Sequence, residues 1–454
     1  MGKYHFIAIG GIGMSGLAKY LLEEGNTVSG SDIQDSKYID ALRELGATVH
    51  IGHCESNVPK DAVVVVSTAI RENNPELVEA KKLGLKIYHR SDLLEEIAKS
   101  AQDNGKIFIG FSGTHGKTTT SGLASFVLEK AKLEPSFVVG GIVPEIHTNA
   151  QHKMGKYFVA ELDESDGTII KYNPDILVIN NLEEDHVDFY KNGLSDLVST
   201  FDAAISHSKK VIINKDNSGT NLLSGNFITF GLKDADYTAR NIRYTQEGTY
   251  FEIYHHQQRL SDMFITLCGV HNVYNTLAVA AALNEAGGAN IDCIKEFFAE
   301  FEGMGRRFQK VCEINGVSVY DDYAHHPTEI KSTLEAAATR FGKDNIVAVF
   351  QPHRYTRLQG LWNDFKGAFD NAGRVVVTDV YAASEDPIDG VTGSKFSTEL
   401  DGSEYMGGSM EDVSKNLIKT LKKGNVVIGL GAGTITNLGK HLKNQAEKYF
   451  ASRS

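Results

Sequence analysis

Residues 107–119 read Ile107-Phe-Ile-Gly-Phe-Ser-Gly113-Thr-His-Gly-Lys117-Thr118-Thr119, an apolar run followed directly by a glycine-rich turn. The run predicts a buried strand, and the apolar residues after the turn recur at helical spacing. A strand, a glycine-rich loop and a helix in this order are typical of α/β proteins that bind phosphate, because backbone N–H groups of the loop point at the anion. Lys117 can neutralise phosphate oxygens, and the hydroxyl of Thr118 can bind Mg²⁺.

The match to the phosphate-binding pattern covers only the Gly-Lys-Thr end of the loop. Phe111 stands where the strict pattern has its first glycine. A tight turn without a ligand is therefore the alternative interpretation of this loop, and the segments downstream decide between the two.

Two acidic segments follow predicted strands further along the chain. They read Glu161-Leu-Asp163-Glu164-Ser-Asp166 and Glu183-Glu-Asp185-His186-Val-Asp188. Carboxylate oxygens, with an occasional imidazole, suit Mg²⁺ held against phosphates. Either segment alone is as well explained as a solvated acidic loop. Because open α/β sheets bind ligands beyond the carboxyl ends of their strands, the pair favours a metal–nucleotide site.

A second glycine loop lies near the N-terminus and reads Gly11-Ile-Gly13-Met-Ser-Gly16. It follows a predicted strand and precedes a predicted helix, and Asp32 comes near the end of the next strand. This pattern is typical of dinucleotide binding, since glycines let the backbone approach a diphosphate. Taken alone it favours NAD, and tight packing of helix on strand is the structural alternative. The loop does not fix the type of ligand.

The last third of the chain carries cations and histidines beyond predicted strands that should be neighbours in one sheet. Arg354 and Arg357 follow the strand at 346–350, and His325 follows the strand at 317–320. Arginine binds carboxylates bidentately, so the two arginines can form a carboxylate clamp, with structural salt bridges as the alternative. Zinc at residues 325–326 is not expected, because adjacent histidines lack helical i, i+4 spacing and have no cysteine partner.

Strand and helix patterns alternate along the whole chain and predict three α/β domains. A polar stretch at 99–105 and a glycine-containing hinge at 302–305 divide the chain into 1–104, 105–304 and 305–454. The outer two domains are expected to be Rossmann-like, and the central one a P-loop-type mixed α/β ATPase domain. The expected strands are 4–9, 27–30, 62–66, 85–88, 107–111, 156–160, 176–179, 211–213, 249–254, 264–267, 317–320, 346–350, 375–378 and 426–430. The expected helices include 15–24, 41–45, 75–83, 92–99, 273–283, 294–301, 328–338, 358–369 and 413–421.

Composition excludes several classes of protein. The chain has 454 residues, 41% hydrophobic and 23% charged, with 44 Gly and 8 Pro, which indicates ordinary globular domains. A net charge of −12 argues against nucleic-acid partners and anionic membranes. The four cysteines form no C-x-x-C pair, and no apolar run reaches membrane-spanning length, so we expect a cytoplasmic protein without membrane insertion.

Taken together and in order, these segments resemble the Mur ligase family over nearly the whole chain. The motifs that carry the resemblance are Gly-Gly-Ile-Gly-Met-Ser-Gly, Gly-Thr-His-Gly-Lys-Thr-Thr, Glu-Leu-Asp-Glu-Ser-Asp, Glu-Glu-Asp-His-Val-Asp, His-Asn-Val-Tyr-Asn, Gly-Arg-Arg-Phe, Asp-Asp-Tyr-Ala-His-His-Pro-Thr-Glu and Phe-Gln-Pro-His-Arg-Tyr-Thr-Arg. Members of this family keep the Gly-Lys-Thr core without the first glycine. The resemblance implies that the first loop holds the diphosphate of a UDP-sugar, so the NAD interpretation falls.

The implied reaction is ATP-dependent ligation of L-alanine to the lactoyl carboxylate of UDP-N-acetylmuramic acid through an acyl phosphate. The implied cofactors are ATP and Mg²⁺, with Mn²⁺ as an alternative to Mg²⁺, and the protein is expected to be a monomer or homodimer. A recycling ligase that adds a preformed tripeptide to the same sugar nucleotide is the alternative within the family. The segment 350–357 favours alanine. A nicotinamide-dependent oxidoreductase and a non-catalytic nucleotide-binding regulator are the alternatives from other classes.

The resemblance also implies roles for individual residues. Those expected at ATP are Gly113, Thr114, His115, Gly116, Lys117, Thr118, Thr119, Asn272, Asn275, Arg307 and Asp322. Those expected at the UDP-sugar are Gly11, Ile12, Gly13, Met14, Ser15, Asp32 and Ser67. Alanine is expected at Tyr323, His325, Arg354 and Arg357, and the metal at Thr118, Glu161 and His186. The catalytic set is Lys117, Glu161, His186 and Arg307. From the residues alone, Asn272 and Asn275 could instead cap a helix.

Overall fold

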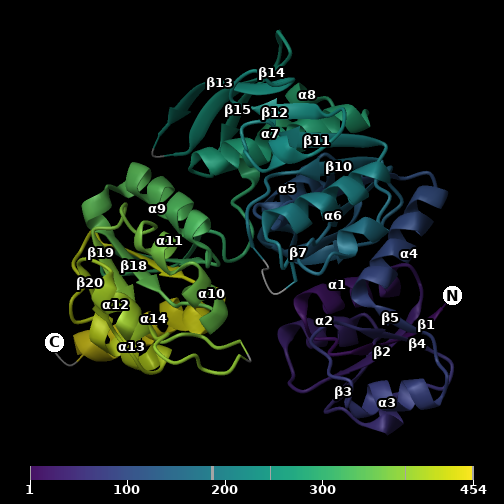
Figure 1. The fold of residues 1–454 in the computed structure, drawn as a ribbon, viewed down its shortest axis with the longest axis horizontal. Coiled ribbons are helices and arrows are strands. Elements are labelled where there is room, and N and C mark those ends of the chain that lie inside the picture. The colour runs from purple at the N-terminus through teal and green to yellow at the C-terminus, as the bar shows by residue number, and fades with distance from the viewer. Residues whose placement is uncertain (1, 186–188, 246, 384, 452–454) are drawn as a thin grey trace. The chain divides into compact units, whose positions relative to one another are not determined.

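The computed structural model describes residues 2–185, 189–245, 247–383 and 385–451 (Figure 1). The chain forms two compact units. The first comprises Met1–Ile242, Tyr250–Ile265 and Val273–Glu302, and the second comprises Arg243–Thr249, Thr266–Asn272 and Gly303–Ser454. The described residues form three sheets, of which the first two lie almost entirely in the first unit and the third in the second unit. The chain is therefore a three-domain α/β protein, as predicted.

The N-terminal sheet has the strand order β3-β2-β1-β4-β5, with neighbouring strands parallel. Its strands are β1 Lys3–Ile7, β2 Thr27–Asp32, β3 Thr48–Ile51, β4 Val63–Val66 and β5 Ile87–His89. Its helices are α1 Ile12–Glu23, α2 Lys37–Glu44, α3 Pro75–Lys82 and α4 Arg90–Asp103, with the 3-10 turn η1 at Glu55–Asn57. The order reverses between β1 and β4, and this is the place where such sheets bind ligands.

The central sheet is mixed and has the order β15-β14-β13-β12-β11-β10-β6-β9-β7-β8. Its strands are β6 Ile107–Ser112, β7 Ser136–Val143, β8 Thr148–Gln151, β9 Tyr157–Glu161, β10 Ile176–Ile179, β11 Lys210–Asn214, β12 Ile228–Gly231, β13 Tyr237–Tyr244, β14 Thr249–His255 and β15 Gln258–Ile265. Its helices are α5 Lys117–Lys130, α6 Leu194–Ser206, α7 Val270–Ala286 and α8 Ile291–Glu300, with 3-10 turns at Pro144–Ile146, Thr168–Lys171 and Thr220–Leu222. The β7–β8 pair is antiparallel, whereas β6 runs parallel to both of its neighbours.

The C-terminal sheet has the order β16-β17-β21-β18-β19-β20. Its strands are β16 Gln309–Ile314, β17 Val317–Asp322, β18 Ile346–Phe350, β19 Arg374–Val377, β20 Ser403–Tyr405 and β21 Val426–Leu430. Its helices are α9 Pro327–Phe341, α10 Tyr355–Gly360, α11 Trp362–Lys366, α12 Gly393–Glu399, α13 Met410–Leu417 and α14 Leu438–Ala451, with 3-10 turns at Lys343–Asn345 and Thr434–Asn437. Only the edge strand β16 runs antiparallel to its neighbour among the described pairs of this sheet.

The predicted pattern differs from the structure at several places. The helix expected over 358–369 is two short helices, because the backbone of Leu361 leaves helical geometry at φ −110° and ψ 23°. The helix expected at 413–421 starts earlier, where Ser409 and Asp412 form a capping box. The strands expected at 317–320 and 346–350 are not direct neighbours, since β21 lies between them. The domain boundaries after residues 104 and 304 stay predictions. Among the described residues, no helix has the length and apolar character that a membrane crossing requires.

A buried carboxylate holds the N-terminal sheet to α3. The side chain of Glu76 has no solvent exposure, and its Oε1 accepts hydrogen bonds from Asn57 Nδ2 at 2.7 Å and Cys54 N at 3.2 Å. Its Oε2 accepts a hydrogen bond from Ser31 Oγ and lies 3.5 Å from His5 Nε2. Burial alone would raise the pKa of Glu76, but these hydrogen bonds lower it to about 2. The charge is therefore stabilised by partners from several elements.

Replacing Glu76 with alanine is expected to lower the free energy of unfolding by about 3–5 kcal/mol, because it leaves buried polar groups without their acceptor. Urea denaturation measures this. Folding lowers the pKa of Glu76 from its ordinary value of 4.5 to about 2. The stabilisation that Glu76 gives the wild-type protein is therefore fully present above pH 4.5 and is lost as the pH falls toward 2. Glu72→Ala is the control, because this side chain is 85% exposed and bonds only to Lys81 among the described residues. Equal midpoints for the two variants would contradict the prediction.

Candidate active site

The phosphate loop connects β6 to α5 and depends on two glycines in the left-handed region. Gly113 has φ +119° and Gly116 has φ +82°. A Cβ on Gly113 would come within 2.8 Å of the carbonyl oxygen of Asn181, and a Cβ on Gly116 would come within 2.8 Å of Asn275 Oδ1. The loop therefore turns tightly into the start of α5, whose first N–H groups have no partner inside the helix. This is the geometry of an anion site.

Two asparagines after β10 hold the loop from the neighbouring strand. His115 N donates to Asn181 Oδ1 at 2.7 Å, and Thr114 N donates to the carbonyl oxygen of Asn181 at 3.0 Å. Asn180 Nδ2 donates to Thr120 Oγ1 at 3.1 Å. Sequence analysis missed both asparagines, because it treated that segment as a source of metal ligands. Their position directly after a strand beside β6 was the available signal.

Lys117 lies among carboxylates with only 13% of its side chain exposed, and it donates to its own loop. Its Nζ lies 2.9 Å from Glu164 Oε1, 2.7 Å from the carbonyl oxygen of Gly113 and 3.2 Å from that of Thr114. Burial alone would lower the pKa of Lys117, but Glu164, Asp163 and Glu161 together raise it. Burial raises the pKa of Glu164 to about 7, and the charge of Lys117 limits that rise. Lys117 is therefore a fixed cation at the mouth of the loop.

Glu161 and Thr118 place two oxygen donors beside this cation. Thr118 Oγ1 donates to Glu161 Oε1 at 3.2 Å, and Gly140 N donates to Glu161 Oε2 at 2.8 Å. Burial raises the pKa of Glu161, so a divalent cation would compensate a carboxylate that the protein itself stabilises poorly. A hydroxyl and a carboxylate next to a phosphate loop fit Mg²⁺. The third predicted metal ligand, His186, lies outside the described residues.

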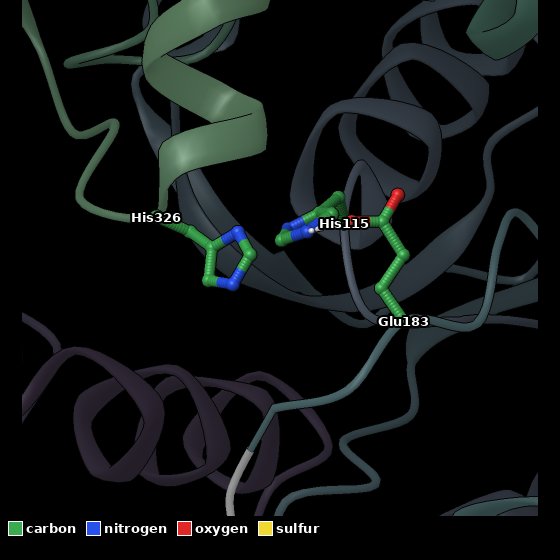
Figure 2. A group of neighbouring side chains, drawn as sticks. All are labelled: His115, Glu183 and His326. Carbon is green, nitrogen blue, oxygen red and sulfur yellow. Dashed lines mark ion pairs between the residues drawn. The ribbon is translucent and has the colours of Figure 1, made fainter. Parts of the chain in front are cut away.

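The second acidic segment also contacts the phosphate loop. His115 Nε2 lies 3.4 Å from Glu183 Oε2, and Figure 2 shows the two side chains facing each other. Glu183 N donates to Thr114 Oγ1 at 2.9 Å. This segment therefore fixes the loop as well as supplying oxygen atoms near it.

The N-terminal glycine loop forms the second predicted ligand site. Gly11 is the N-cap residue of α1, and residues 12–15 form the first turn of this helix. Asp32 Oδ2 accepts a hydrogen bond from Gly10 N at 2.9 Å. Ser67 follows β4, the strand next to β1, so it lies at the same edge of the sheet. Asn149 Nδ2, from β8 of the central sheet, donates to the carbonyl oxygen of Ile12 at 2.7 Å. The structure thus brings the predicted UDP-sugar residues to the switch point of the N-terminal sheet.

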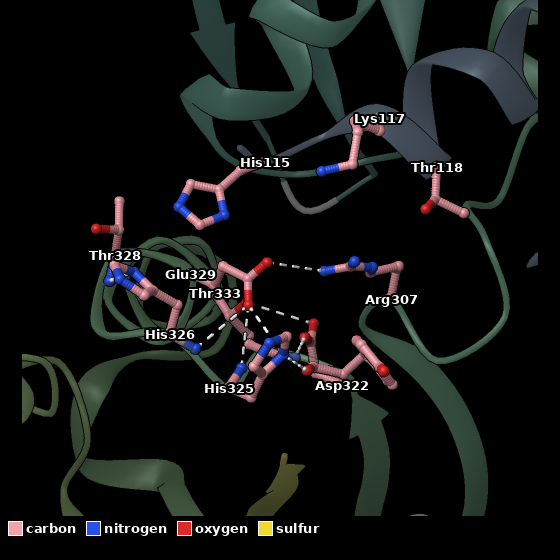
Figure 3. Close-up of polar contacts among 12 residues, drawn as sticks. His115, Lys117, Thr118, Arg307, Asp322, His325, His326, Thr328, Glu329 and Thr333 are labelled. Atoms are coloured by element: carbon pink, nitrogen blue, oxygen red, sulfur yellow. Dashed lines mark hydrogen bonds and ion pairs between the residues drawn. The ribbon is translucent and has the colours of Figure 1, made fainter. Parts of the chain in front are cut away.

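In the second unit, Asp322 and Arg307 lie beside α9. Asp322 accepts hydrogen bonds from Phe308 N at 2.8 Å and Ala324 N at 2.7 Å. Burial raises its pKa to about 6, with Arg307 opposing the rise. Figure 3 shows Glu329 between Arg307, whose Nη1 lies 3.4 Å from Glu329 Oε1, and the backbone N–H of His325, which donates to Oε2 at 3.0 Å. Sequence analysis gave Glu329 no role.

The predicted alanine residues gather at the carboxyl ends of β17 and β18. The rings of His325 and His353 lie 5.7 Å apart, and Arg357 Nη1 lies 3.3 Å from His353 Nδ1. Tyr323 packs edge-on against His325 at 5.2 Å. Burial lowers the pKa of His325 to about 4 and that of His353 to about 3. Both imidazoles are neutral at pH 7, and His353 is a further member that sequence analysis left without a role.

Arg354 and the two asparagines complete the predicted set. Arg354 has φ +70°, begins α10 as its N-cap residue, and its N–H donates to the carbonyl oxygen of Tyr381 at 2.9 Å. Asn275 belongs to the first unit, beside Gly116, whereas Asn272 belongs to the second unit. Asn272 Nδ2 donates to the carbonyl oxygen of Cys268 at 2.8 Å. Asn275 is thus at the phosphate loop, and Asn272 stabilises the start of its own helix.

Comparison with known families covers all three domains. The models described as "Mur ligase family, catalytic domain", "Mur ligase middle domain" and "Mur ligase, glutamate ligase domain" match residues 3–102, 111–283 and 306–433. These matches together cover most of the chain.

Individual relatives match over their full length. A UDP-N-acetylmuramate–L-alanine ligase of Pelobacter propionicus is 40% identical, covering 98% of both chains, and one of Geotalea daltonii is 39% identical, covering 97% of both. The crystal structure of a UDP-N-acetylmuramate-alanine ligase from Thermotoga maritima matches with a TM-score of 0.82 at 30% identity, covering 100% of both chains. A murein peptide ligase from Psychrobacter arcticus shares the fold, with a TM-score of 0.69 at 20% identity, covering 98% of this chain and 99% of that one.

A methyl group added at Gly140 tests whether the oxygen atoms of Thr118 and Glu161 bind the metal. A Cβ there would come within 2.3 Å of Glu161 Oε2, so Gly140→Ala must displace the carboxylate. We expect Mg²⁺-dependent ATP binding to weaken about 10- to 100-fold, as for residues that orient metal ligands. Titration calorimetry with and without Mg²⁺ measures this. Gly360→Ala is the control, because its Cβ would meet nothing within 4 Å. Unchanged Mg²⁺ dependence in Gly140→Ala would place the metal elsewhere.

Proposed function

The chain belongs to the Mur ligase family, and we propose that it joins L-alanine to the lactoyl carboxylate of UDP-N-acetylmuramic acid with conversion of ATP to ADP and phosphate. The observation that carries this proposal is the full-length similarity, at 39–40% identity, to relatives that bear one name. The activity is a step in the synthesis of peptidoglycan precursors. We place it in the cytoplasm, with the protein a monomer or homodimer.

The first unit supplies the ATP site of this proposal. The backbone N–H groups at the start of α5 bind the phosphates, since those of Thr114 and His115 already donate to Asn181, and Lys117 faces the β- and γ-oxygens. Asn275, next to Gly116, reaches the nucleotide from α7. In the second unit, the family resemblance gives Arg307 a role at phosphate, Asp322 a role at ribose and Asn272 a role at adenine, and these three roles stay predictions.

Thr118 and Glu161 would hold the metal, and the family resemblance adds His186 as a third ligand. Bound Mg²⁺, or Mn²⁺ in its place, offsets the repulsion between the substrate carboxylate and the γ-phosphate. Glu161 suits metal binding for two reasons. Gly140 N fixes one of its oxygen atoms, and the ion pair of Lys117 is made with Glu164 and not with Glu161. The second acidic segment holds the loop through Glu183, which contacts Thr114 and His115.

The sugar nucleotide binds at residues 11–15, with Asp32 and Ser67 at the same sheet edge. The helix N-terminus of α1 stabilises its diphosphate. Alanine binds in the second unit. The guanidinium groups of Arg354 and Arg357 bind the carboxylate of alanine, and His325 and Tyr323 contact the rest of the amino acid. His325 is neutral at pH 7, so no imidazole charge has to be removed when alanine binds.

Two transfers complete the reaction. A lactoyl carboxylate oxygen attacks the γ-phosphorus, the bond to the β-phosphate bridging oxygen breaks, and ADP leaves. Lys117 stabilises the charge that develops on the transferring group. The neutral amine of alanine then attacks the acyl carbon of the acyl phosphate, phosphate leaves, and the nitrogen loses a proton. The product is an amide.

The choice of amino donor separates this function from the recycling ligase. With UDP-N-acetylmuramic acid, Mg²⁺ and ATP present, we expect ADP release with L-alanine and none above background with the tripeptide L-alanyl-γ-D-glutamyl-meso-diaminopimelate. A coupled ADP assay measures both. ADP release with the tripeptide alone would assign the recycling reaction, and ATP binding without ADP release under either condition would indicate a regulator.

Lys117→Ala is expected to lower kcat about 10²- to 10³-fold or more, because it removes a preorganised cation from the phosphoryl group in the transition state. In the absence of nucleotide, UDP-N-acetylmuramic acid should bind with unchanged affinity, since its loop belongs to a different sheet. Lys130→Ala is the matched control, because Lys130 ends the same helix and pairs with Glu300 at 2.7 Å. Steady-state kinetics with calorimetry checks both. A kcat near that of wild type in Lys117→Ala would refute the assigned role.

A further inference from the structure

Arg90 connects the N-terminal domain to the acidic segment beside the phosphate loop. It is the first residue of α4, and its Nη2 donates to Asp163 Oδ2 at 2.9 Å. The side chains of Arg90 and Asp163 are 32% and 31% exposed, so the pair lies in a partly open place. Within the described ranges, the Arg90 guanidinium donates to no residue other than Asp163.

Asp163 is part of the charge arrangement around Lys117. It lies between Glu161 and Glu164 in sequence, and the first of these bonds to Thr118 while the second bonds to Lys117. Burial alone would raise the pKa of Asp163, but Lys117 and Arg90 lower it to about 2. Asp163 in turn contributes to the field that keeps Lys117 protonated. A movement of Arg90 therefore changes the position of Asp163 and the charge around Lys117, beside the phosphate loop.

The other edge of the same guanidinium faces the N-terminal glycine loop. Arg90 Nη1 lies 4.0 Å from the position that a Cβ on Gly13 would occupy. Gly13 has no side chain, so nothing of this residue stands between the Arg90 guanidinium and the backbone at the start of α1. Arginine has five N–H donors in a planar fork, and it can bind two acidic groups at once.

We propose that Arg90 is a positioning residue that couples the two ligand loops: one edge of its guanidinium binds a phosphate or carboxylate oxygen of the sugar nucleotide at Gly13, while the other edge holds Asp163. The inference rests on the proposed function, because it takes the sugar nucleotide as the ligand of residues 11–15. Binding of the sugar nucleotide then fixes Asp163 and the carboxylates beside it, which favours the arrangement that binds Mg²⁺ and ATP. By thermodynamic linkage, ATP strengthens sugar-nucleotide binding by the same factor.

A salt bridge that merely joins two domains would give a different result. Lys171 offers the comparison, because it also joins the central domain to α4, through Asp92 and Ser91, without approaching either glycine loop. Loss of Lys171 removes a similar cross-domain contact, so it should affect stability without affecting the coupling between ligands.

The test compares the affinity for nucleotide in the absence and in the presence of the sugar nucleotide. Calorimetry gives the Kd of Mg²⁺ with β,γ-methylene-ATP, first alone and then with saturating UDP-N-acetylmuramic acid. For wild type and Lys171→Ala we expect at least about five-fold tighter nucleotide binding in the second state. For Arg90→Lys, whose single ammonium cannot bridge two acids in a plane, and for Arg90→Gln, we expect the factor to fall below two. Asp163→Asn should remove the coupling to the same extent, and Arg90→Lys/Asp163→Asn should lose no more than either single variant.

The outcomes separate this inference from the function it rests on. Coupling that persists in folded Arg90→Lys and Arg90→Gln, or that is absent from a wild-type protein that ligates alanine, overturns the role of Arg90 and leaves the ligase assignment intact. Failure of the wild type to bind UDP-N-acetylmuramic acid, with no ADP release in the presence of alanine, overturns the proposed function instead. Two readouts use the intact chain: the coupling factor and the alanine-dependent release of ADP.

Discussion

The ion pair between the largely buried ammonium of Lys117 and the buried Glu164 is the interaction on which the first unit depends. Removing a charged group from water is costly, and the cost is recovered only when opposite charges and hydrogen-bond acceptors are close. Here Glu164 lies at 2.9 Å, and two carbonyl oxygens of the loop accept the remaining protons. Glu164 is itself fully buried, and only the nearby ammonium limits the rise of its pKa, so its ionised form depends on Lys117. The loop, the first turn of α5 and the segment after β9 are therefore fixed as one structure before any ligand arrives.

The strand order makes this arrangement possible. β6 lies between β10 and β9, and it is parallel to both, so three carboxyl ends meet at one edge of the sheet. The loop after β6 therefore has the asparagines that follow β10 on one side and the carboxylates at the end of β9 on the other. β7 follows β9 in the sheet and brings Gly140 against Glu161. The phosphate loop supplies the anion site, and its neighbours determine which side chains can reach it.

Sequence reasoning found the loops, because glycine, lysine and threonine at fixed spacing have few other uses after a buried strand. The residue pattern alone could not separate the roles of Glu161, Asp163 and Glu164, and only the family resemblance singled out Glu161. Three acids within four residues look alike as letters, whereas their roles depend on which cation each one meets after folding. The contact of Gly140 with Glu161, and that of Arg90 with Asp163, join residues 21 and 73 positions apart, and no local pattern encodes them. Strand order was equally hidden, as β21, the last strand in sequence, separates β17 from β18.

The overall charge of −12 also hides the local electrostatics of the second unit. Burial keeps His325 and His353 neutral at pH 7, so the imidazoles shape the site at β17 and β18 without adding charge. The positive potential there comes from guanidinium groups, which stay protonated at every physiological pH. A site built in this way attracts a carboxylate with little dependence on pH between 6 and 8, whereas charged histidines would lose that attraction across the same range. Neutral histidines beside arginines thus suit the proposed recognition of an amino-acid carboxylate, and they do not suit a pH-sensitive switch.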